Sequence, residues 1–130
     1  MPERLGVDEL LDAARRGLRR LTPEEAHAAA RDGAVVIDIR SVDEQARQGA
    51  VIPGSVHHPL SVVLWRLDPD VSTENAKLPL DTHVILICRQ GYSSSLAAQQ
   101  LREIGFERAT DVIGGVEAWV AEKLPTDPWH

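Results

Sequence analysis

The 130-residue chain contains a single cysteine, Cys88, and this scarcity excludes several classes of protein. One thiol forms no internal disulfide and builds no cysteine-rich zinc or iron–sulfur site, so a disulfide-stapled secreted scaffold is excluded. A chain without disulfides is typical of a reducing compartment, and we expect a cytoplasmic protein. Cys88 is then either a small buried hydrophobe or a reactive thiol.

The chain also lacks an excess of basic charge and long apolar runs. Its 20 acidic and 14 basic side chains give a formal net charge of −6, which disfavours a nucleic-acid partner. No apolar run approaches the roughly 18 residues that a membrane span needs. Mixed charges occupy residues 1–20, where a secretory signal would need an apolar stretch. We therefore expect neither a nucleic acid nor a membrane as partner.

The chain does contain an alternation of strand and helix patterns, over a length that fits one domain. The most hydrophobic run, residues 84–88, predicts a central strand, and capping boxes at 22–25 and 41–44 predict helix starts. Strands are predicted at 34–39, 55–58, 84–88 and 109–113. Helices are predicted at 8–20, between Thr22 and Gly33, between Ser41 and Gly49, at 61–67, at 93–104 and after Gly115.

Strands separated by helices predict an α/β fold, with a small, mostly parallel sheet of about five strands and helices on both faces. We divide the chain into an N-terminal helical extension (1–21), a domain (22–124) and a tail (125–130), and we expect the tail to be frayed. Ligands of such sheets bind beyond the carboxyl ends of the strands. Cys88 ends the 84–88 strand, so the fold places the thiol at this edge.

The residues after Cys88 favour a reactive thiol. The order is strand, cysteine, glycine-containing loop and helix, so loop N–H groups and the positive helix end can converge on an anion and favour a thiolate. Arg89 adds a positive charge, and Gly91 permits the positive φ of a tight cradle. The serines at 93–95 offer hydroxyls that cap the helix or bind an anionic substrate. The alternative is a plain strand–loop–helix connection with capping serines.

Spacing separates other kinds of thiol and loop chemistry. A cysteine-dependent phosphatase needs an arginine six positions after the nucleophile, and that position is Ser94. The Gly-Lys-Ser/Thr of a phosphate-binding P-loop is absent, and a thioredoxin-type site needs a second cysteine. A cysteine protease needs a paired histidine, which the five histidines leave open although nothing in the loop supports it.

Four segments, in order, resemble motifs of the single-domain rhodaneses, a sulfurtransferase family. They are Asp38-Ile39-Arg40 with Glu44, Ile52-Pro53-Gly54-Ser55, the six-residue loop that Cys88 opens, and Gly114-Gly115 with Trp119. The resemblance covers residues 22–124 and implies a rhodanese-like fold that needs no metal or organic cofactor. It also implies transfer of sulfane sulfur through a persulfide on Cys88. The donor would be thiosulfate or a persulfide or polysulfide, and the acceptor a thiol, cyanide or a protein.

The resemblance also implies roles for particular residues. Cys88 would be the catalytic nucleophile, and the residues after it would bind the substrate: Arg89, Gln90, Gly91, Tyr92, Ser93 and Ser94. Ser93 stands where the family usually has an arginine. This loss of positive charge weakens the case for thiosulfate as preferred donor, and it leaves a non-catalytic binding or sulfur-sensing module as the alternative function.

Other polar residues have plainer interpretations. Asp38 and Arg40 lie two apart on a strand and share a face, so we expect an ion pair that supports the site, with substrate contact as the alternative. His57 and His58 are expected to lie at the surface or to pack in a loop, with catalysis as the alternative, and two histidines without carboxylates at ligand spacing predict no metal site. The arginines at 15, 16, 19 and 20 are expected to form a solvated helix face or, as the alternative, a surface for an acidic partner.

Overall fold

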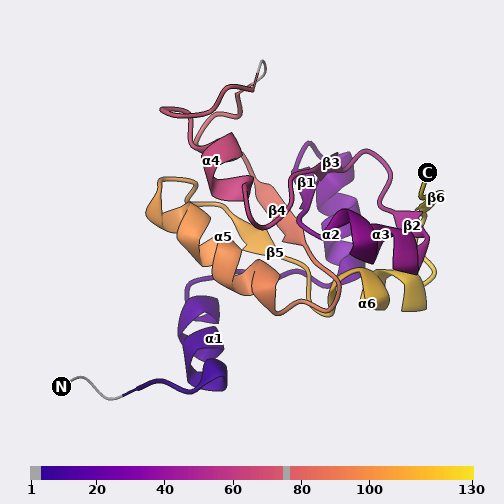
Figure 1. Cartoon of the computed structure of the whole chain (residues 1–130), viewed down its shortest axis with the longest axis horizontal. Coiled ribbons are helices and arrows are strands. Elements are labelled where there is room, and N and C mark those ends of the chain that lie inside the picture. Colours follow the sequence, from indigo (N-terminus) through magenta and orange to yellow (C-terminus); the bar gives the residue numbers. More distant parts are fainter. Residues whose placement is uncertain (1–3, 75–76) are drawn as a thin grey trace.

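The computed structural model describes residues 4–74 and 77–130 (Figure 1). Residues 1–3 of the extension and residues 75–76 of the segment between the fourth helix and the fourth strand lie outside the described residues. The four strands of the main sheet are all parallel and follow the order β3 (Val56–His57), β1 (Val35–Asp38), β4 (Val84–Ile87) and β5 (Thr110–Asp111). The helices are α1 (Val7–Arg15), α2 (Pro23–Arg31), α3 (Val42–Gln48), α4 (Val63–Leu67), α5 (Ser93–Glu103) and α6 (Gly115–Ala121).

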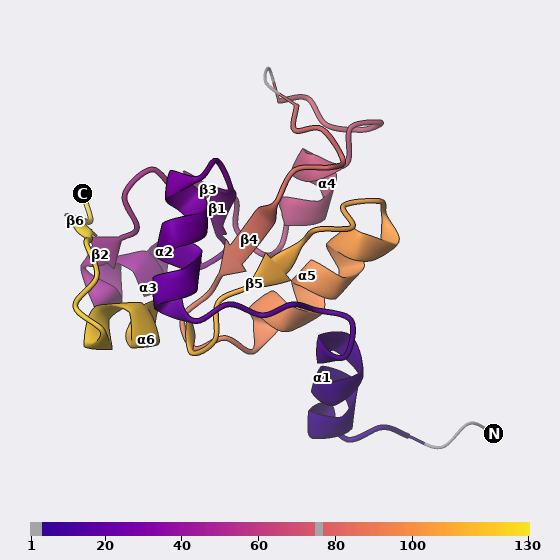
Figure 2. The ribbon, with the colours of Figure 1, turned by 180° about the vertical axis from the view of Figure 1, so that it is seen from behind.

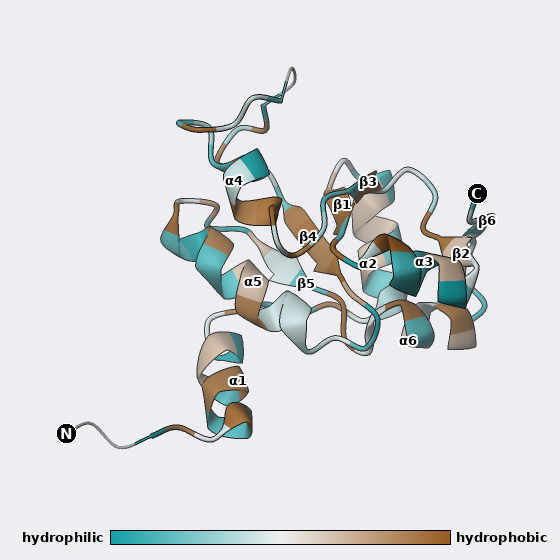
Figure 3. Ribbon diagram, viewed as in Figure 1, coloured by the Kyte–Doolittle hydropathy of each residue, from teal (hydrophilic) through white to brown (hydrophobic). Residues whose placement is uncertain are grey.

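The fully buried strand β4 separates two hydrophobic clusters. Val84 and Leu86 pack with α4 and α5, whereas Ile85 and Ile87 pack with α2 and α6. Figures 1 and 2 show the sheet between these two groups of helices, and β4 is its most hydrophobic strand (Figure 3). The alternation follows from the twofold period of a strand, and it confirms the predicted layers. Cys88 continues the alternation on the α5 side.

Local signals place the start of α2 and the end of α5 where the sequence predicts them. The Thr22 hydroxyl accepts from the Glu25 N–H at 3.2 Å while the Glu25 carboxylate accepts from the Thr22 N–H at 2.9 Å, which completes the capping box of α2. After α5, the Phe106 N–H donates to the Leu101 carbonyl at 3.0 Å, as in a Schellman motif. None of the helices within the described residues combines the length and apolarity of a membrane span.

The N-terminal extension is helical for a shorter stretch than the predicted 8–20. Helix α1 ends at Arg15, and the chain then runs beside β5. The Leu21 N–H donates to the Asp111 carbonyl at 3.1 Å, and the Ile113 N–H donates to the Leu21 carbonyl at 2.8 Å. This isolated parallel bridge extends the four-stranded sheet at its β5 edge. Pairing with the sheet overrides the helical periodicity after Gly17.

The prediction of a frayed tail is wrong for part of residues 125–130. Strand β6 (Asp127–Pro128) pairs antiparallel with β2 (Ala50–Val51), and the Trp129 N–H donates to the Gly49 carbonyl at 3.1 Å. Backbone hydrogen bonds to a segment that is distant in the sequence hold the tail, and periodicity within the tail carries no signal for them.

Candidate active site

Cys88 directly follows β4, and its side chain lies at the carboxyl edge of the sheet, as predicted. The residue is only 5% exposed. The Gly91 N–H donates to Cys88 Sγ at an N···S distance of 3.1 Å, and Sγ donates to Ser94 Oγ at 3.3 Å. The loop from Cys88 to Ser94 therefore closes around the sulfur, with one backbone donor and one hydroxyl in contact with it.

The loop is shaped by glycines that face other backbone atoms. Gly91 has φ +86°, and a Cβ there would lie 2.8 Å from the Gly114 nitrogen. At Gly115, with φ +62°, a Cβ would lie 2.4 Å from the Cys88 carbonyl oxygen. The first turn of α6 then donates the Val116 N–H to that same Cys88 carbonyl at 2.9 Å. The Gly-Gly pair thus lets α6 dock on the backbone of the candidate nucleophile.

The serines of the loop have a partner that the sequence analysis missed, the buried carboxylate of Asp111 in β5. Ser94 Oγ and Ser95 Oγ donate to Asp111 Oδ2 at 2.7 and 2.8 Å. The N-terminus of α5 has no side-chain cap, so helix capping, one of the two roles expected for these hydroxyls, is not the role they take. A carboxylate with no exposed surface attracts both hydroxyls because it needs hydrogen-bond donors inside the protein. A charged residue in the middle of a predicted strand was the available signal.

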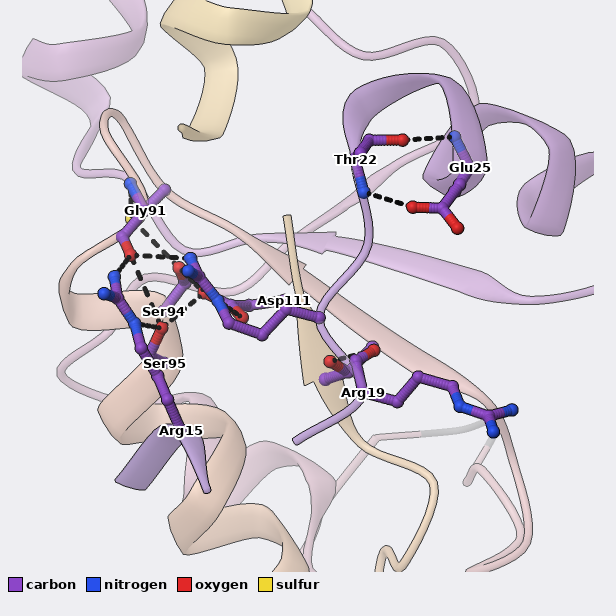
Figure 4. Close-up of polar contacts among 11 residues, drawn as sticks. Arg15, Arg19, Thr22, Glu25, Gly91, Ser94, Ser95 and Asp111 are labelled. Atoms are coloured by element: carbon purple, nitrogen blue, oxygen red, sulfur yellow. Dashed lines mark hydrogen bonds and ion pairs between the residues drawn. The ribbon is translucent and has the colours of Figure 1, made fainter. Parts of the chain in front are cut away.

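Two arginines of the N-terminal extension complete this cluster (Figure 4). Arg20 binds both carboxylate oxygens of Asp111, at 2.8 Å from Nε and 3.2 Å from Nη2. Arg15 Nη2 and Arg20 Nη2 donate to the Gly91 carbonyl at 2.7 and 3.1 Å. The prediction of a solvated arginine face is therefore wrong for Arg15 and Arg20, because helix α1 ends early and the chain turns back along β5.

In the described part of the chain, the side chains of the other residues predicted to bind the substrate make no hydrogen bond to the Cys88 sulfur or to Asp111. Arg89 Nε donates to Glu117 Oε2 of α6 at 2.9 Å, and Gln90 Nε2 lies 3.5 Å from Glu117 Oε1. Tyr92 is 60% exposed, and Ser93 begins α5 and is partly exposed. The charge of Arg89 is thus shared with a neighbouring carboxylate, at an exposed position.

Asp38 and Arg40 form the expected ion pair, and both side chains are buried. Arg40 Nη2 and Nε contact Asp38 Oδ2 and Oδ1 at 2.7 and 3.0 Å, and the Arg40 side chain has no exposed surface. Gln45 Nε2 adds a donor to Asp38 Oδ2 at 3.0 Å, and His57 Nε2 lies 2.7 Å from the Arg40 carbonyl oxygen. Asp38 pairs with Ile87 in the sheet, so this network lies next to the end of the strand that precedes Cys88.

The donor set at the site is one thiol with serines, arginines and one carboxylate. Among the described residues, no group of three or more His, Cys, Asp or Glu side chains is arranged to hold a metal ion. The cluster instead suits a nucleophilic sulfur that is held by hydrogen bonds.

Comparison with known proteins agrees with this geometry. The family profile described as "Rhodanese-like domain" matches residues 22–122. A relative from Pseudomonas savastanoi pv. phaseolicola, "Thiosulfate sulfurtransferase GlpE", is 38% identical over 104 residues, which cover 79% of this chain and 88% of that protein. The chain therefore belongs to the rhodanese-like family. Relatives of this kind confirm the expected class of enzyme, a rhodanese-type sulfurtransferase.

Two further matches cover very different shares of the matched proteins. "Adenylyltransferase and sulfurtransferase MOCS3" of Arabidopsis thaliana is 36% identical over 87 residues, and the matched part is 61% of this chain but only 19% of that protein. A solved structure from Rhodopseudomonas palustris, described as a protein of unknown function and a possible tyrosine phosphatase, has a TM-score of 0.80 and 27% identity. It covers 98% of this chain and 99% of its own, so this likeness includes the N-terminal extension.

Proposed function

We propose that this protein moves sulfane sulfur from a donor to a thiophilic acceptor through a persulfide on Cys88. The observation that supports it best is the sulfur itself, held between the Gly91 N–H and Ser94 Oγ at the carboxyl edge of the sheet. We also propose a cytoplasmic location, which rests on the sequence argument that a chain without disulfides is typical of a reducing compartment.

The reaction would proceed in two displacements. The Cys88 thiolate attacks the outer sulfur of the donor, a new S–S bond forms, and the donor's own S–S bond breaks to release sulfite or a thiolate. The acceptor nucleophile then attacks the outer sulfur of the persulfide, and Cys88 leaves as a thiolate. The Gly91 N–H would stabilise the anionic sulfur in both steps. With one cysteine in the chain, the persulfide is relieved by an external acceptor.

The charge around the loop favours a persulfide or polysulfide donor over thiosulfate. Ser93 carries no charge, and Arg89 is paired with Glu117 at 2.9 Å. A thiosulfate dianion gains less from such a loop than from one with free guanidinium groups. As acceptor we propose a thiol or a protein, with cyanide as the acceptor in the assay. A protein acceptor is included because the Arabidopsis relative is named as both an adenylyltransferase and a sulfurtransferase.

The test is thiocyanate formation from thiosulfate and from a polysulfide, with cyanide as acceptor, in the parent and in Cys88→Ala. We expect turnover in the parent and none above background in the variant. Mass spectrometry of the donor-treated parent should show the added mass of one sulfur atom on Cys88. A Cys88→Ala variant as active as the parent would refute the mechanism. A parent that gains no sulfur from any donor would favour the non-catalytic binding or sensing module.

Phosphatase chemistry receives no support from the site. Position 94, where a cysteine-dependent phosphatase carries its phosphate-binding arginine, is a serine whose hydroxyl is bonded to the Asp111 carboxylate. We expect the parent to hydrolyse an aryl phosphate no faster than Cys88→Ala does, even when the aryl phosphate is as concentrated as a sulfur donor that saturates sulfur transfer.

A further inference from the structure

The N-terminal extension contributes two arginines to the loop that holds Cys88 (Figure 4). Both donate to the Gly91 carbonyl, Arg15 Nη2 at 2.7 Å and Arg20 Nη2 at 3.1 Å, and Arg15 Nε also donates to Ser95 Oγ at 3.0 Å. The match to the rhodanese-like family begins at residue 22. The two arginines therefore come from a part of the chain that precedes the family's own motifs.

Gly91 links these arginines to the sulfur because both of its backbone groups are engaged. Its N–H donates to Cys88 Sγ at 3.1 Å, while its carbonyl accepts from the two guanidinium groups. Its positive φ of +86°, and the 2.8 Å that would separate a Cβ from the Gly114 nitrogen, require a glycine at this position. The N–H and the carbonyl belong to adjacent peptide planes that meet at the Gly91 Cα, so the two arginine bonds fix one side of the joint that carries the N–H.

Arg20 additionally neutralises the carboxylate that lies one hydroxyl away from Cys88. Asp111 has no exposed side-chain surface and is bonded by Arg20 through both oxygens. Ser94 donates to Asp111 at 2.7 Å and accepts from Cys88 Sγ at 3.3 Å. Without Arg20, an uncompensated negative charge would face the thiolate and the anionic persulfide, and like charges disfavour each other.

Other charges around the loop are paired locally. Arg89 and Glu117 form an exposed pair at 2.9 Å, and Asp38 and Arg40 form a buried pair in and after β1 at 2.7 Å. The positive charge on the inner side of the loop is therefore supplied by the extension.

We propose that Arg15 and Arg20 are positioning residues for Cys88: they hold the Gly91 N–H on the sulfur, and Arg20 offsets the charge of Asp111. The N-terminal extension is thereby part of the sulfur-transfer site. The expected effect of these arginines on sulfur-transfer rates rests on the proposed function, whereas their expected effect on the reactivity of the Cys88 thiol does not.

The test compares Arg20→Gln and Arg15→Gln with Arg16→Gln and Arg19→Gln, which remove the same charge from exposed arginines of the same segment. The Arg19 side chain points away from the cluster in Figure 4. The first readout is the alkylation rate of Cys88 by iodoacetamide as a function of pH. Because the chain has one cysteine, the mass of the whole protein reports on that thiol alone.

We expect the midpoint of the Arg20→Gln pH profile to lie about one pH unit above that of the parent, with alkylation near neutral pH about tenfold slower. Arg15→Gln should be about threefold slower, since it loses contacts to Gly91 and Ser95 but leaves Asp111 paired. Arg20→Lys keeps the charge and should recover about half of the loss on a logarithmic scale. Both control variants should stay within about twofold of the parent.

Identical pH profiles in Arg20→Gln, Arg15→Gln and the two controls would overturn the inference. If Arg20→Gln does not fold, Arg15→Gln decides alone, because it leaves the buried carboxylate paired. The second readout is sulfur transfer. Here Arg15→Gln and Arg20→Gln, the two cluster variants, should lower kcat more than they raise KM. Shifted alkylation profiles in a protein that never accepts sulfur would reject the proposed function and support the positioning role. Sulfur transfer unaffected by both cluster variants would reject the positioning role alone.

Discussion

Single side chains set the charge that a sulfur donor meets. Ser93 begins α5 and brings no charge to the loop, while Arg89 is held by Glu117. The loop after Cys88 therefore carries little unpaired charge at these two positions, and a single substitution can change this.

Ser93→Arg should raise kcat/KM for thiosulfate about tenfold, because a guanidinium bound to an anion contributes about 1.5–3 kcal/mol in favourable cases. Ser93→Gln is the matched control, since it adds length and hydrogen-bonding groups without charge. Steady-state rates with thiosulfate and with a polysulfide measure the effect. An equal gain with both donors, or an equal gain in the glutamine variant, would contradict the role of charge.

Two histidines away from the site should make the stability depend on pH. Burial lowers the pKa of His58, which a nearby Glu74 carboxylate partly opposes, and burial followed by the Arg108 charge lowers the pKa of His83. The unfolded chain then binds protons more readily than the folded one, so the free energy of unfolding should decrease as the pH falls through about 6.5, the ordinary pKa of histidine.

Urea denaturation at several pH values above the titration range of the carboxylates measures this dependence. The double variant His58→Gln/His83→Gln should show a flatter profile than the parent. A parent whose stability rises on acidification through this range would contradict the direction.

At the scale of secondary-structure elements, α6 and the loop that follows Cys88 form one unit. The Val116 and Glu117 N–H groups donate to the Cys88 and Arg89 carbonyls at 2.9 and 3.1 Å. This contact requires that residue 115 have no side chain, because a Cβ there would lie 2.4 Å from the Cys88 oxygen.

Gly115→Ala should therefore lower both stability and sulfur transfer. Gly54→Ala is the matched control, because Gly54 also has a positive φ, +75°, but nothing within 4 Å of a Cβ. We expect Gly115→Ala to cost about 2 kcal/mol more than Gly54→Ala and to lower the turnover rate about tenfold or more. Urea denaturation and steady-state kinetics measure the two effects. Equal losses in both variants would show that backbone strain alone matters.

For the molecule as a whole, the shared sheet couples the two hydrophobic clusters. Ile85 and Leu86 are neighbours in β4, both fully buried, and they face opposite clusters. Ile85→Ala and Leu86→Ala should each lower the free energy of unfolding by about 2–5 kcal/mol. Each variant should still unfold in a single transition by fluorescence and by circular dichroism. Two separate transitions in either variant would show that the clusters unfold independently.

The sequence by itself determined the α/β layers, the central strand, the capped helices and the place of Cys88 at the carboxyl edge. These features follow from periodicity and from residues close together in the chain. It also indicated the pairing of Asp38 with Arg40, although Arg40 lies two residues beyond the end of β1 and not on the strand itself.

Only the tertiary structure decided where α1 ends, that the tail pairs with β2, and which groups surround the loop. Arg15 and Arg20 meet Gly91 and Asp111 across more than 70 positions of sequence, as the separations of 71, 76 and 91 show. A local pattern does not report such contacts, because they form only when the extension lies beside β5. The cysteine was visible in the sequence, whereas the charges that act on it were brought there by the fold.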